Sequence, residues 1–445
     1  MHTLEQLRAG RLAGATRLNL SEGLTEFPRE IFELADTLEV LNLSGNALST
    51  LPADLGRLHK LRILFCSDNQ FTAVPESVGQ CPALSMVGFK ANRIHTLPGA
   101  ALPPQLRWLI LTDNALQALP PEIGRCQHLQ KLMLAGNQLQ ELPETMAACT
   151  QLELLRLAAN RFTALPAWLL QLPRLAWLAY AGNPFADRSE AAVVARHPIQ
   201  AINWPELTLE EQLGEGASGV IFRAQWQAAD APPRAIAVKL FKGQVTSDGL
   251  PRSEMDACIS AGQHPNLIGV EGKIEGHPNG AEGLVLALID PAFRNLAGPP
   301  SFATCTRDVY ASDTRFSVEA ALRIARGIAG VAAHLHAQGI LHGDLYAHNI
   351  LTTEAGECLL GDFGAASFYE PTDVAAATAL QRLEVRAFGC LLEELLTHCQ
   401  LPASAEAIGE GLWALQRRCV QPEVAARPLF ADIEQALAQV ASATS

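Results

Sequence analysis

The sequence lacks the features of a membrane protein, a nucleic-acid-binding protein and a disulfide-rich protein. No uninterrupted apolar stretch approaches the roughly 18–20 residues that cross a membrane. There is no run of Lys and Arg, and the formal net charge is −13, which argues against nucleic acid or an anionic membrane as the main partner. The ten Cys include no C-x-x-C pair, which is typical of reduced thiols and not of a disulfide framework or zinc site.

The N-terminal residues, Met1 to Leu7, have neither a basic stretch nor an apolar stretch of the kind found in signal peptides. We therefore expect a cytoplasmic protein without a membrane span. Apolar residues make up 49% of the 445 residues and charged residues only 18%. This length and composition predict two or three globular domains, each able to bury its own core.

A leucine-rich pattern repeats through the first half. Leu38 to Leu48 fits L-x-x-L-x-L-x-x-N-x-L, and its Asn recurs at steps of 22 or 23 residues. The L-x-L residues predict a short strand, the Asn a turn held by backbone hydrogen bonds, and a following Leu-Pro the return along the outer face. One unit cannot bury its apolar side alone, whereas a stack of about three or more can. The recurring residues are Asn46, Asn69, Asn92, Asn114, Asn137, Asn160 and Asn183.

Large apolar residues recur at the strand positions that would face the concave surface. Because large apolar patches usually bind something, we expect a protein partner on this surface, either another protein or the second half of this chain. The alternatives are that the sheet tolerates scattered apolar residues or that a flanking segment covers them. The residues expected to be exposed there are Ile63, Phe65, Met86, Trp108, Met133 and Trp177.

A glycine-rich segment opens the second half. Leu213 to Ile221 fits G-x-G-x-x-G. In dinucleotide-binding folds this pattern leads into a helix, whereas the flanking residues here are typical of the two strands of a β-hairpin. Glycines let such a hairpin approach phosphates that any Cβ would block. The glycines are Gly214, Gly216 and Gly219.

A single Lys interrupts the apolar strand that follows. Ala235 to Phe241 is otherwise apolar, and Lys239 is costly there unless it is paired or faces an anion; taken alone, an edge-strand Lys that reaches water would fit equally well. Its expected partner is Glu254, ten residues before His264-Pro265-Asn266, with Asp256 as the alternative.

Two further elements follow in order. Residues 284–289 form an apolar strand that we expect to wall an adenine pocket, although an ordinary core strand would look the same. Ser317 is the expected N-cap of a core helix from Val318 to about His336.

The most specific pattern lies after this helix. His342 to Asn349 fits H-x-D-x-x-x-x-N, and Asp362-Phe363-Gly364 comes shortly downstream. In phosphoryl transfer, the Asp of the first motif accepts the proton of the attacking hydroxyl, while its Asn and the Asp of the second hold Mg²⁺ against nucleotide phosphates. Each fragment alone is common, but their order behind the glycine loop and the Lys strand is a strong signal.

These motifs resemble the eukaryotic-type protein kinase family over roughly residues 206–440, and the C-x₇-R-P-x-F pattern from Cys419 is most similar to its tyrosine-kinase-like branch. The first half resembles the short, intracellular leucine-rich repeat family. The pairing resembles cytoplasmic leucine-rich-repeat kinases. The expected fold is an α/β leucine-rich-repeat solenoid followed by an α+β bilobal protein-kinase fold. The expected domains are residues 1–185 (repeats), 186–205 (cap and linker) and 206–440 (kinase).

The resemblance also implies roles for individual residues. Lys239 would hold the α- and β-phosphates and Glu254 would hold Lys239. Asp344 would be the catalytic base, and Asn349 and Asp362 would bind Mg²⁺. ATP would lie under Gly214, Gly216 and Gly219, with its adenine between Ile221, Ala237, Leu286 and Leu288.

Three departures from the family pattern stand out. Gly343 replaces the Arg that would receive an activation-loop phosphate, and Tyr346 replaces a Lys near the transferred phosphate. No A-P-E motif is present, and Glu384, which stands where an Asp is usual, follows Asp362 by only 22 positions. Arg427 therefore lacks its usual Glu partner, and control by loop phosphorylation is not expected.

The sequence predicts an ATP- and Mg²⁺-dependent protein kinase, directed to Ser or Thr, with a repeat domain that binds a protein. Two alternatives remain open. H-G-D-L also resembles small-molecule kinases, and a nucleotide-binding scaffold with little catalysis would carry the same repeats.

Overall fold

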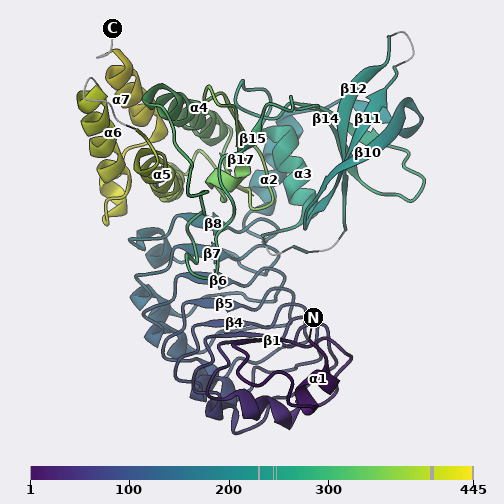
Figure 1. Cartoon of the computed structure of the whole chain (residues 1–445). Helices are drawn as coiled ribbons and strands as arrows, with labels where there is room; N and C mark the ends of the chain where they lie inside the picture. Colours follow the sequence, from purple (N-terminus) through teal and green to yellow (C-terminus); the bar gives the residue numbers. More distant parts are fainter. Residues whose placement is uncertain (1, 229–230, 244, 247, 401–404, 443–445) are drawn as a thin grey trace. The chain divides into compact units, whose positions relative to one another are not determined.

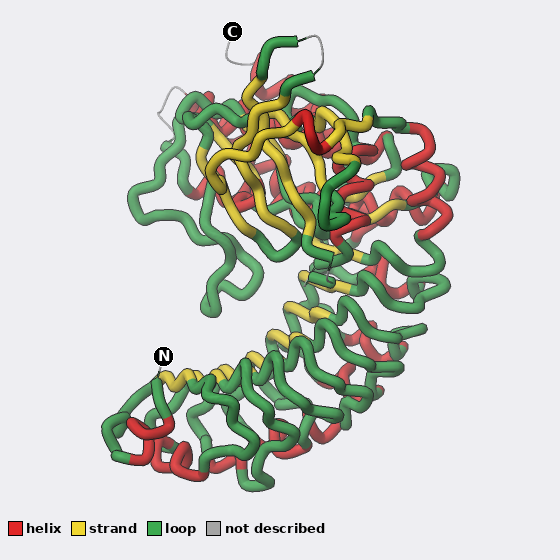
Figure 2. The backbone as a smooth tube through the Cα atoms, turned by 90° about the vertical axis from the view of Figure 1, so that its right-hand side faces the viewer, coloured by secondary structure: helices red, strands yellow, loops and turns green. Residues whose placement is uncertain are grey.

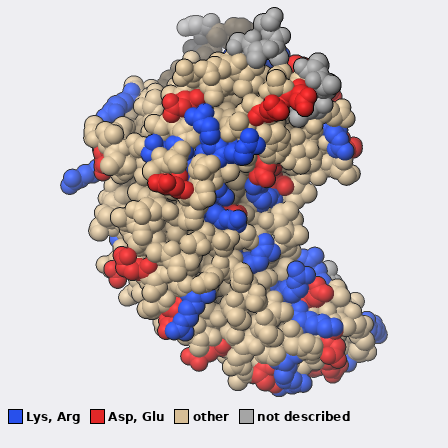
Figure 3. All heavy atoms as spheres, turned by 90° about the vertical axis from the view of Figure 1, so that its left-hand side faces the viewer, with Lys and Arg blue, Asp and Glu red and all other residues tan. Residues whose placement is uncertain are grey.

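The computed structural model describes residues 2–228, 231–243, 245–246, 248–400 and 405–442. The chain divides into two compact units, residues 1–172 and 173–445 (Figure 1). In the described part of the chain, every helix is too short or too polar to span a bilayer. On the face shown in Figure 3, side chains of both charges are interspersed.

The first unit is a stack of short parallel strands, each paired in register with the next. In Figure 2 the strands line one side of the stack and short helical turns lie on the other. Since side chains alternate along a strand, the central Leu or Val of each points into the core. The strands are β1 (Arg17–Asn19), β2 (Val40–Asn42), β3 (Ile63–Phe65), β4 (Met86–Gly88), β5 (Trp108–Ile110), β6 (Lys131–Met133) and β7 (Leu154–Arg156).

The 3₁₀ turns return the chain as the Leu-Pro pattern predicts. A Pro directly precedes most of them and sets an extended entry. Besides the short helix α1 (Leu4–Arg8), these turns are η1 (Arg29–Leu34), η2 (Leu55–Arg57), η3 (Glu76–Gln80), η4 (Gly99–Ala101), η5 (Pro121–Arg125), η6 (Glu144–Ala148) and η7 (Ala167–Gln171).

The repeating Asn holds the backbone of two repeats together. Asn69 Nδ2 donates to Leu43 O (2.9 Å) and Cys66 O (3.2 Å), while its Oδ1 accepts from Leu48 N (2.9 Å). Asn92 makes the same set of bonds one repeat later. Backbone groups that a turn would leave unpaired are satisfied in this way, so the predicted role of the Asn is confirmed.

The predicted exposed apolar surface is only partly present. Phe65 and Trp108 are half-buried. Lys131 Nζ lies 4.3 Å from the centre of the Trp108 ring. The expectation that every member would be exposed is wrong: neighbouring side chains in a closely spaced parallel sheet cover one another, and Trp177 is covered by the stacked ring of Tyr346. The buried members are Ile63 (7% exposed), Met86 (2%), Met133 (6%) and Trp177 (2%).

The second unit begins with residues of the last repeat and continues into a six-stranded sheet. Strand β8 (Trp177–Ala179) carries the last repeat pattern. Residues 186–205, predicted as a cap and linker, contain helix α2 (Asp187–Arg196) and strand β9 (Ala201–Asn203). The sheet order is β10-β11-β12-β14-β13-β9, and β9 pairs parallel with β13. The other members are β10 (Leu207–Glu215), β11 (Gly219–Trp226), β12 (Arg234–Phe241), β13 (Val270–Glu275) and β14 (Gly283–Ala287); turn η8 (Trp204–Glu206) leads into β10.

Helices dominate the remainder of this unit. Helix α3 (Pro251–Ser260) follows β12, and α4 (Val318–Ala337) begins where predicted, with Ser317 Oγ accepting from Ala320 N. The other elements are β15 (Arg294–Asn295), β16 (Ile340–Leu341), η9 (Ala347–Asn349), β17 (Ile350–Thr352), β18 (Cys358–Leu360), β19 (Ser367–Phe368), α5 (Val374–Thr397), α6 (Glu406–Cys419), η11 (Val424–Ala426) and α7 (Phe430–Ser442).

Helix α5 accounts for the missing A-P-E segment. It begins at Val374, capped by Asp373, and already contains the Ala-rich stretch that follows Asp362-Phe363-Gly364. The strand β19, which lies between them, pairs antiparallel with β16. Residues 364–373 therefore form a short, tightly held connection, which we call the short segment.

Candidate active site

The glycine-rich segment is the tip of the β10–β11 hairpin, as predicted from its flanks. Gly216 N donates to Gly219 O (2.9 Å) across the tip. A Cβ at Gly219 would lie 2.4 Å from Leu240 O, so the fold itself requires glycine there. At Gly214 and Gly216 a Cβ would meet nothing within 4 Å. The fold therefore does not require glycine at these two positions. That a bound phosphate requires it stays a prediction.

Side chains along β12 point alternately to the two faces of the sheet, one facing an apolar core and the other a cleft. Ile236 and Val238 pack in the apolar cluster behind the sheet. Ala237 and Lys239 point to the opposite face, where Ala237 is paired with Leu286 and Lys239 with Ile221. The sheet thus brings four predicted nucleotide-binding residues to one face. Leu288 lies just beyond the end of β14 and is half-buried.

The Lys239 ammonium forms an ion pair with Glu254 on α3. The side chains are 15% and 1% exposed, respectively. Burial alone would lower the pKa of Lys239, but the negative charges of Glu254 and Asp362 outweigh it and raise that pKa. Asp256, the alternative partner, instead lies 4.0 Å from Arg252. Lys239 is therefore held as a cation at the edge of the cleft.

A cavity of about 200 Å³ lies beside this pair. Its lining includes both the glycine loop, with Ser218 at one of its variable positions, and Asp362, and it adds Thr246 and Asp248, which no sequence pattern marks. Asp344, Asn349, Gly214, Ala237 and Leu286 do not line it. The predicted residues that do are Gly216, Gly219, Ile221, Lys239 and Asp362.

The loop that carries Asp344 is ordered from within. Asn349 Nδ2 donates to Asp344 O (2.9 Å) and to Asp344 Oδ2 (2.8 Å), which fixes the carboxylate. His342 is fully buried and its Nε2 lies 2.8 Å from Gly361 O, just before Asp362. The two motifs are therefore joined by a direct hydrogen bond.

Asp362 has a positive φ of 52°, a conformation that Asp tolerates better than most residues. Its Oδ1 accepts from Gly364 N (3.1 Å), and the ring of Phe363 lies 5.1 Å from that of His342. Since the amide nitrogen of Asn349 is engaged by Asp344, its Oδ1 is the atom left to face a cation. An amide oxygen and an exposed carboxylate match the donors that Mg²⁺ takes together with phosphate oxygens.

Two residues support the loop from beneath: Glu384, which the sequence marks only as standing where an Asp is usual, and Asp308, for which the sequence gives no signal. Glu384, 3% exposed, accepts from Gly343 N (2.7 Å), and its Oε2 lies 2.7 Å from His336 Nε2. Burial would raise the pKa of Glu384, but these hydrogen bonds and nearby histidines lower it. The carboxylate of Asp308 holds His348 at two points: its Oδ2 accepts from the backbone N of His348 (2.9 Å), and its Oδ1 lies 2.7 Å from Nδ1 of the His348 ring.

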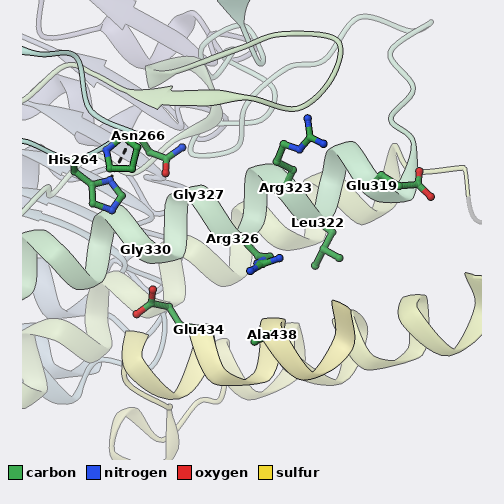
Figure 4. A pocket seen from close by; sticks show the side chains of 11 residues that line it. His264, Asn266, Glu319, Leu322, Arg323, Arg326, Gly327, Gly330, Glu434 and Ala438 are labelled. Atoms are coloured by element: carbon green, nitrogen blue, oxygen red, sulfur yellow. Dashed lines mark hydrogen bonds between the residues drawn. The ribbon is translucent and has the colours of Figure 1, made fainter. Parts of the chain in front are cut away.

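A larger cavity, about 720 Å³, lies between α4, α7 and the turn after α3 (Figure 4). Its lining mixes charges of both signs, with Arg323 and Arg326 opposed by Glu319 and Glu434, and it also includes His264. It contains no residue of the glycine loop, the Lys strand or either phosphoryl-transfer motif. Volume alone therefore does not select the candidate site; the glycine loop, Lys239 and Asp362 converge on the smaller cavity.

Comparison with known proteins separates the two halves. Residues 207–388 match the family described as protein tyrosine and serine/threonine kinase. Residues 37–58 and 104–162 match leucine-rich repeat families. The mouse protein named leucine-rich repeat and calponin homology domain-containing protein 1 is 32% identical over 124 residues, which is 27% of this chain and 17% of that protein.

Two relatives are named as kinases. Serine/threonine-protein kinase PkaA of Streptomyces coelicolor is 27% identical over 282 residues, or 52% of this chain and 49% of that protein. Serine/threonine-protein kinase mos of Xenopus laevis is 26% identical over 180 residues, or 40% and 46%. The chain thus spans less than half the length of these relatives.

Proposed function

We propose that this chain, in which leucine-rich repeats precede a protein kinase domain, transfers the γ-phosphoryl group of ATP to a Ser or Thr hydroxyl of a protein. The observation that carries the proposal is the Lys239–Glu254 ion pair beside a cavity that also contains the glycine loop and Asp362. A buried Lys held as a cation next to a glycine hairpin is suited to bind phosphates. The preference for Ser and Thr rests on the names of the two kinase relatives.

In the proposed reaction, Asp344 accepts the proton of the acceptor hydroxyl as the oxygen attacks the γ-phosphorus, and the bond from that phosphorus to the β,γ-bridging oxygen breaks to release ADP. The hydrogen bonds from Asn349 hold its carboxylate in one orientation, and positioning of this kind is a major part of catalysis. Lys239 steadies the α- and β-phosphates, and Gly216 and Gly219 cover them.

Mg²⁺ would be held by Asn349 and Asp362, and when bound it neutralises charge on the phosphates. The adenine would lie against the sheet face that carries Ile221, Ala237 and Leu286, with Leu288 beyond it. The cavity beside Lys239 matches the phosphate end of ATP and leaves the base to this apolar face.

A small-molecule kinase is the second candidate, and the short segment favours it. Since α5 begins at Val374, few residues remain after Asp362 to shape a groove for an extended peptide. The acceptor would then be a metabolite hydroxyl placed against Asp344 by other surfaces.

The repeats are proposed to bind a protein. Phe65 on β3 and Trp108 on β5, both half-buried, are the aromatic side chains best placed to anchor a partner, since aromatic anchors dominate such interfaces. The buried members of the predicted surface do not contribute.

The test compares the wild type with Asp344→Asn, using labelled ATP with Mg²⁺. The control is Asp313→Asn, an exposed loop residue. We expect Asp344→Asn to lose a factor of about 10²–10⁴ in phosphotransfer, as befits a general base, and the control to lose nothing. ATP–Mg²⁺ should raise the melting temperature of all three proteins by mass action.

Each outcome selects one reading. Label on protein supports the protein kinase, whereas label confined to an added metabolite supports the small-molecule kinase. If saturating ATP–Mg²⁺ leaves the wild-type melting curve unchanged, the nucleotide site is wrong and only a scaffold remains.

A further inference from the structure

Three departures from the kinase pattern meet at one stretch of chain. This stretch, residues 173–185, completes the last leucine-rich repeat and belongs to the second compact unit. We call it the terminal repeat segment. Gly343 and Tyr346 lie three positions apart on the loop that carries Asp344, and Arg427 lies much later in the chain, yet each contacts this segment.

Tyr346, which stands where a Lys is usual, stacks on Trp177. The ring centres are 4.2 Å apart and the planes differ by 7°. Trp177 Nε1 also donates to Leu345 O (3.2 Å), the residue next to Asp344. Trp177 and Tyr346 are 2% and 4% exposed. One indole therefore fixes both a side chain and a carbonyl of the loop that carries the proposed base.

Gly343 stands where an Arg is usual, and the close approach of the terminal repeat segment requires a glycine there. Its φ is +72°, and a Cβ there would lie 2.4 Å from Ala365 O and 2.8 Å from Leu178 O. Any side chain would push the loop away from either the short segment or the terminal repeat segment. Glycine at this position is thus explained by the close approach of two backbones.

Arg427, which lacks its usual Glu, donates instead to backbone carbonyls. Its Nη2 lies 2.7 Å from Pro173 O, at the start of the terminal repeat segment. On α5, Arg386 Nε donates to Arg174 O (3.1 Å). Two cations of the kinase domain thus hold the first residues of this segment.

The terminal repeat segment also binds the short segment. Tyr180 N donates to Ser367 Oγ (2.9 Å). Ser367 is fully buried, and Tyr369 is 5% exposed with its hydroxyl donating to His336 O (2.7 Å). Neither hydroxyl is accessible to a modifying enzyme in this arrangement. The short segment is therefore ordered by hydrogen bonds that need no phosphate.

We propose that the terminal repeat segment is a permanent part of the catalytic domain and that Trp177 is a positioning residue for the Asp344 loop. It supplies the order that phosphorylation of an activation loop would give. The catalytic consequence rests on the proposed kinase function, whereas the docking itself does not.

The experiment uses the full chain with Trp177→Ala, Trp177→Phe and, as a control, Trp168→Ala. Trp168 is half-buried in turn η7, close in sequence but outside the terminal repeat segment. Hydrogen exchange is followed over residues 340–349 and 364–370, with β12 as internal reference. Steady-state kcat and KM for ATP are measured in parallel, before and after phosphatase treatment.

In Trp177→Ala, exchange over both stretches should accelerate about 10-fold or more through easier local opening, with β12 unchanged. We expect kcat to fall about 10-fold or more while KM for ATP stays within about 2-fold, because the phosphate-binding residues lie on other elements. Trp177→Phe should keep most of the wild-type exchange protection and most of the wild-type kcat, since it keeps an aromatic stack. Trp168→Ala and phosphatase treatment should leave them unchanged.

Equal exchange in Trp177→Ala and Trp168→Ala would overturn the docking. Faster exchange with unchanged kcat would overturn the positioning role. A large loss of kcat on phosphatase treatment would restore conventional loop control. If the wild type transfers no phosphate at all, the proposed function fails while exchange still decides the docking. Should Trp177→Ala not melt cooperatively, Trp177→Leu is measured under the same expectations.

Discussion

Arg427 gives the sharpest test of how the second compact unit is held together. The side chain is 1% exposed. It donates from Nε to Gln421 O (2.9 Å), from Nη1 to Arg382 O (3.1 Å) and from Nη2 to Pro173 O (2.7 Å). Burial and nearby Arg386 lower its pKa to about 10, which still leaves a cation at neutral pH. One guanidinium therefore satisfies carbonyls from three separate stretches of chain.

Arg427→Met keeps an unbranched side chain and removes all three donors. A hydrogen bond to a charged group contributes about 1.5–3 kcal/mol, and a buried carbonyl left unpaired costs a similar amount. Against this, the substitution relieves the desolvation of a cation that has no carboxylate partner among these contacts, an offset of roughly 1–4 kcal/mol by analogy with buried ion pairs. We expect a net loss of about 2–4 kcal/mol, which lowers the melting temperature by roughly 5–15 °C for a unit of this size.

The assay is thermal unfolding of the full chain followed by circular dichroism. The matched control is Arg418→Met on α6, where the side chain is exposed and a change within about 0.5 kcal/mol is expected. Arg427→Lys should fall between, since one ammonium cannot reach three carbonyls in the geometry of a guanidinium fork. A melting temperature of Arg427→Met within about 2 °C of the wild type would refute the reasoning, because the three bonds would then add nothing to stability.

Two further predictions concern the buried support of the loop and the repeat surface. Glu384→Gln should destabilise the domain by about 1–3 kcal/mol at pH 7, since a charged acceptor of two hydrogen bonds is replaced by a neutral one. Because the folded-state pKa of Glu384 is depressed, its contribution is present above the unfolded pKa of about 4.3 and is lost as pH falls through the folded value; a pH–stability profile of Glu384→Gln that parallels the wild type would contradict this. Phe65→Ala with Trp108→Ala should raise the Kd of a protein partner selected with the wild-type repeats by about 10-fold or more, with Lys60→Ala, an exposed residue, as the control; unchanged Kd would remove this face as the contact surface.

Much of the architecture follows from the sequence because its signals are local and periodic. The repeating Asn at steps of 22 or 23 residues predicts the stack and its hydrogen bonds. Ser317 predicts the start of α4, and the flanks of the glycine loop predict a hairpin. The spacing of Glu254 identifies the residue that the structure pairs with Lys239. Each depends on residues close together in the chain or on a fixed spacing.

The rest depends on contacts between distant segments. The burial of Met86 and Met133 follows from neighbouring strands and not from their own repeat. Residues 201–203 have no periodic pattern in the sequence and so fall within the predicted linker; only the parallel pairing with β13 reveals strand β9. The support of His348 by Asp308 joins residues 40 positions apart with no motif to mark them.

The departures at Gly343, Tyr346 and Arg427 look independent in the sequence, where each removes a familiar contact. In space they are linked, because the terminal repeat segment supplies a carbonyl against Gly343, an indole against Tyr346 and a carbonyl to Arg427. A larger side chain at 343 would clash with Leu178 O, and a flexible Lys at 346 would not offer the flat ring that Trp177 covers. The three residues are therefore best understood as one adaptation to a docked segment, and a change at any one of them should weaken the contacts made by the other two.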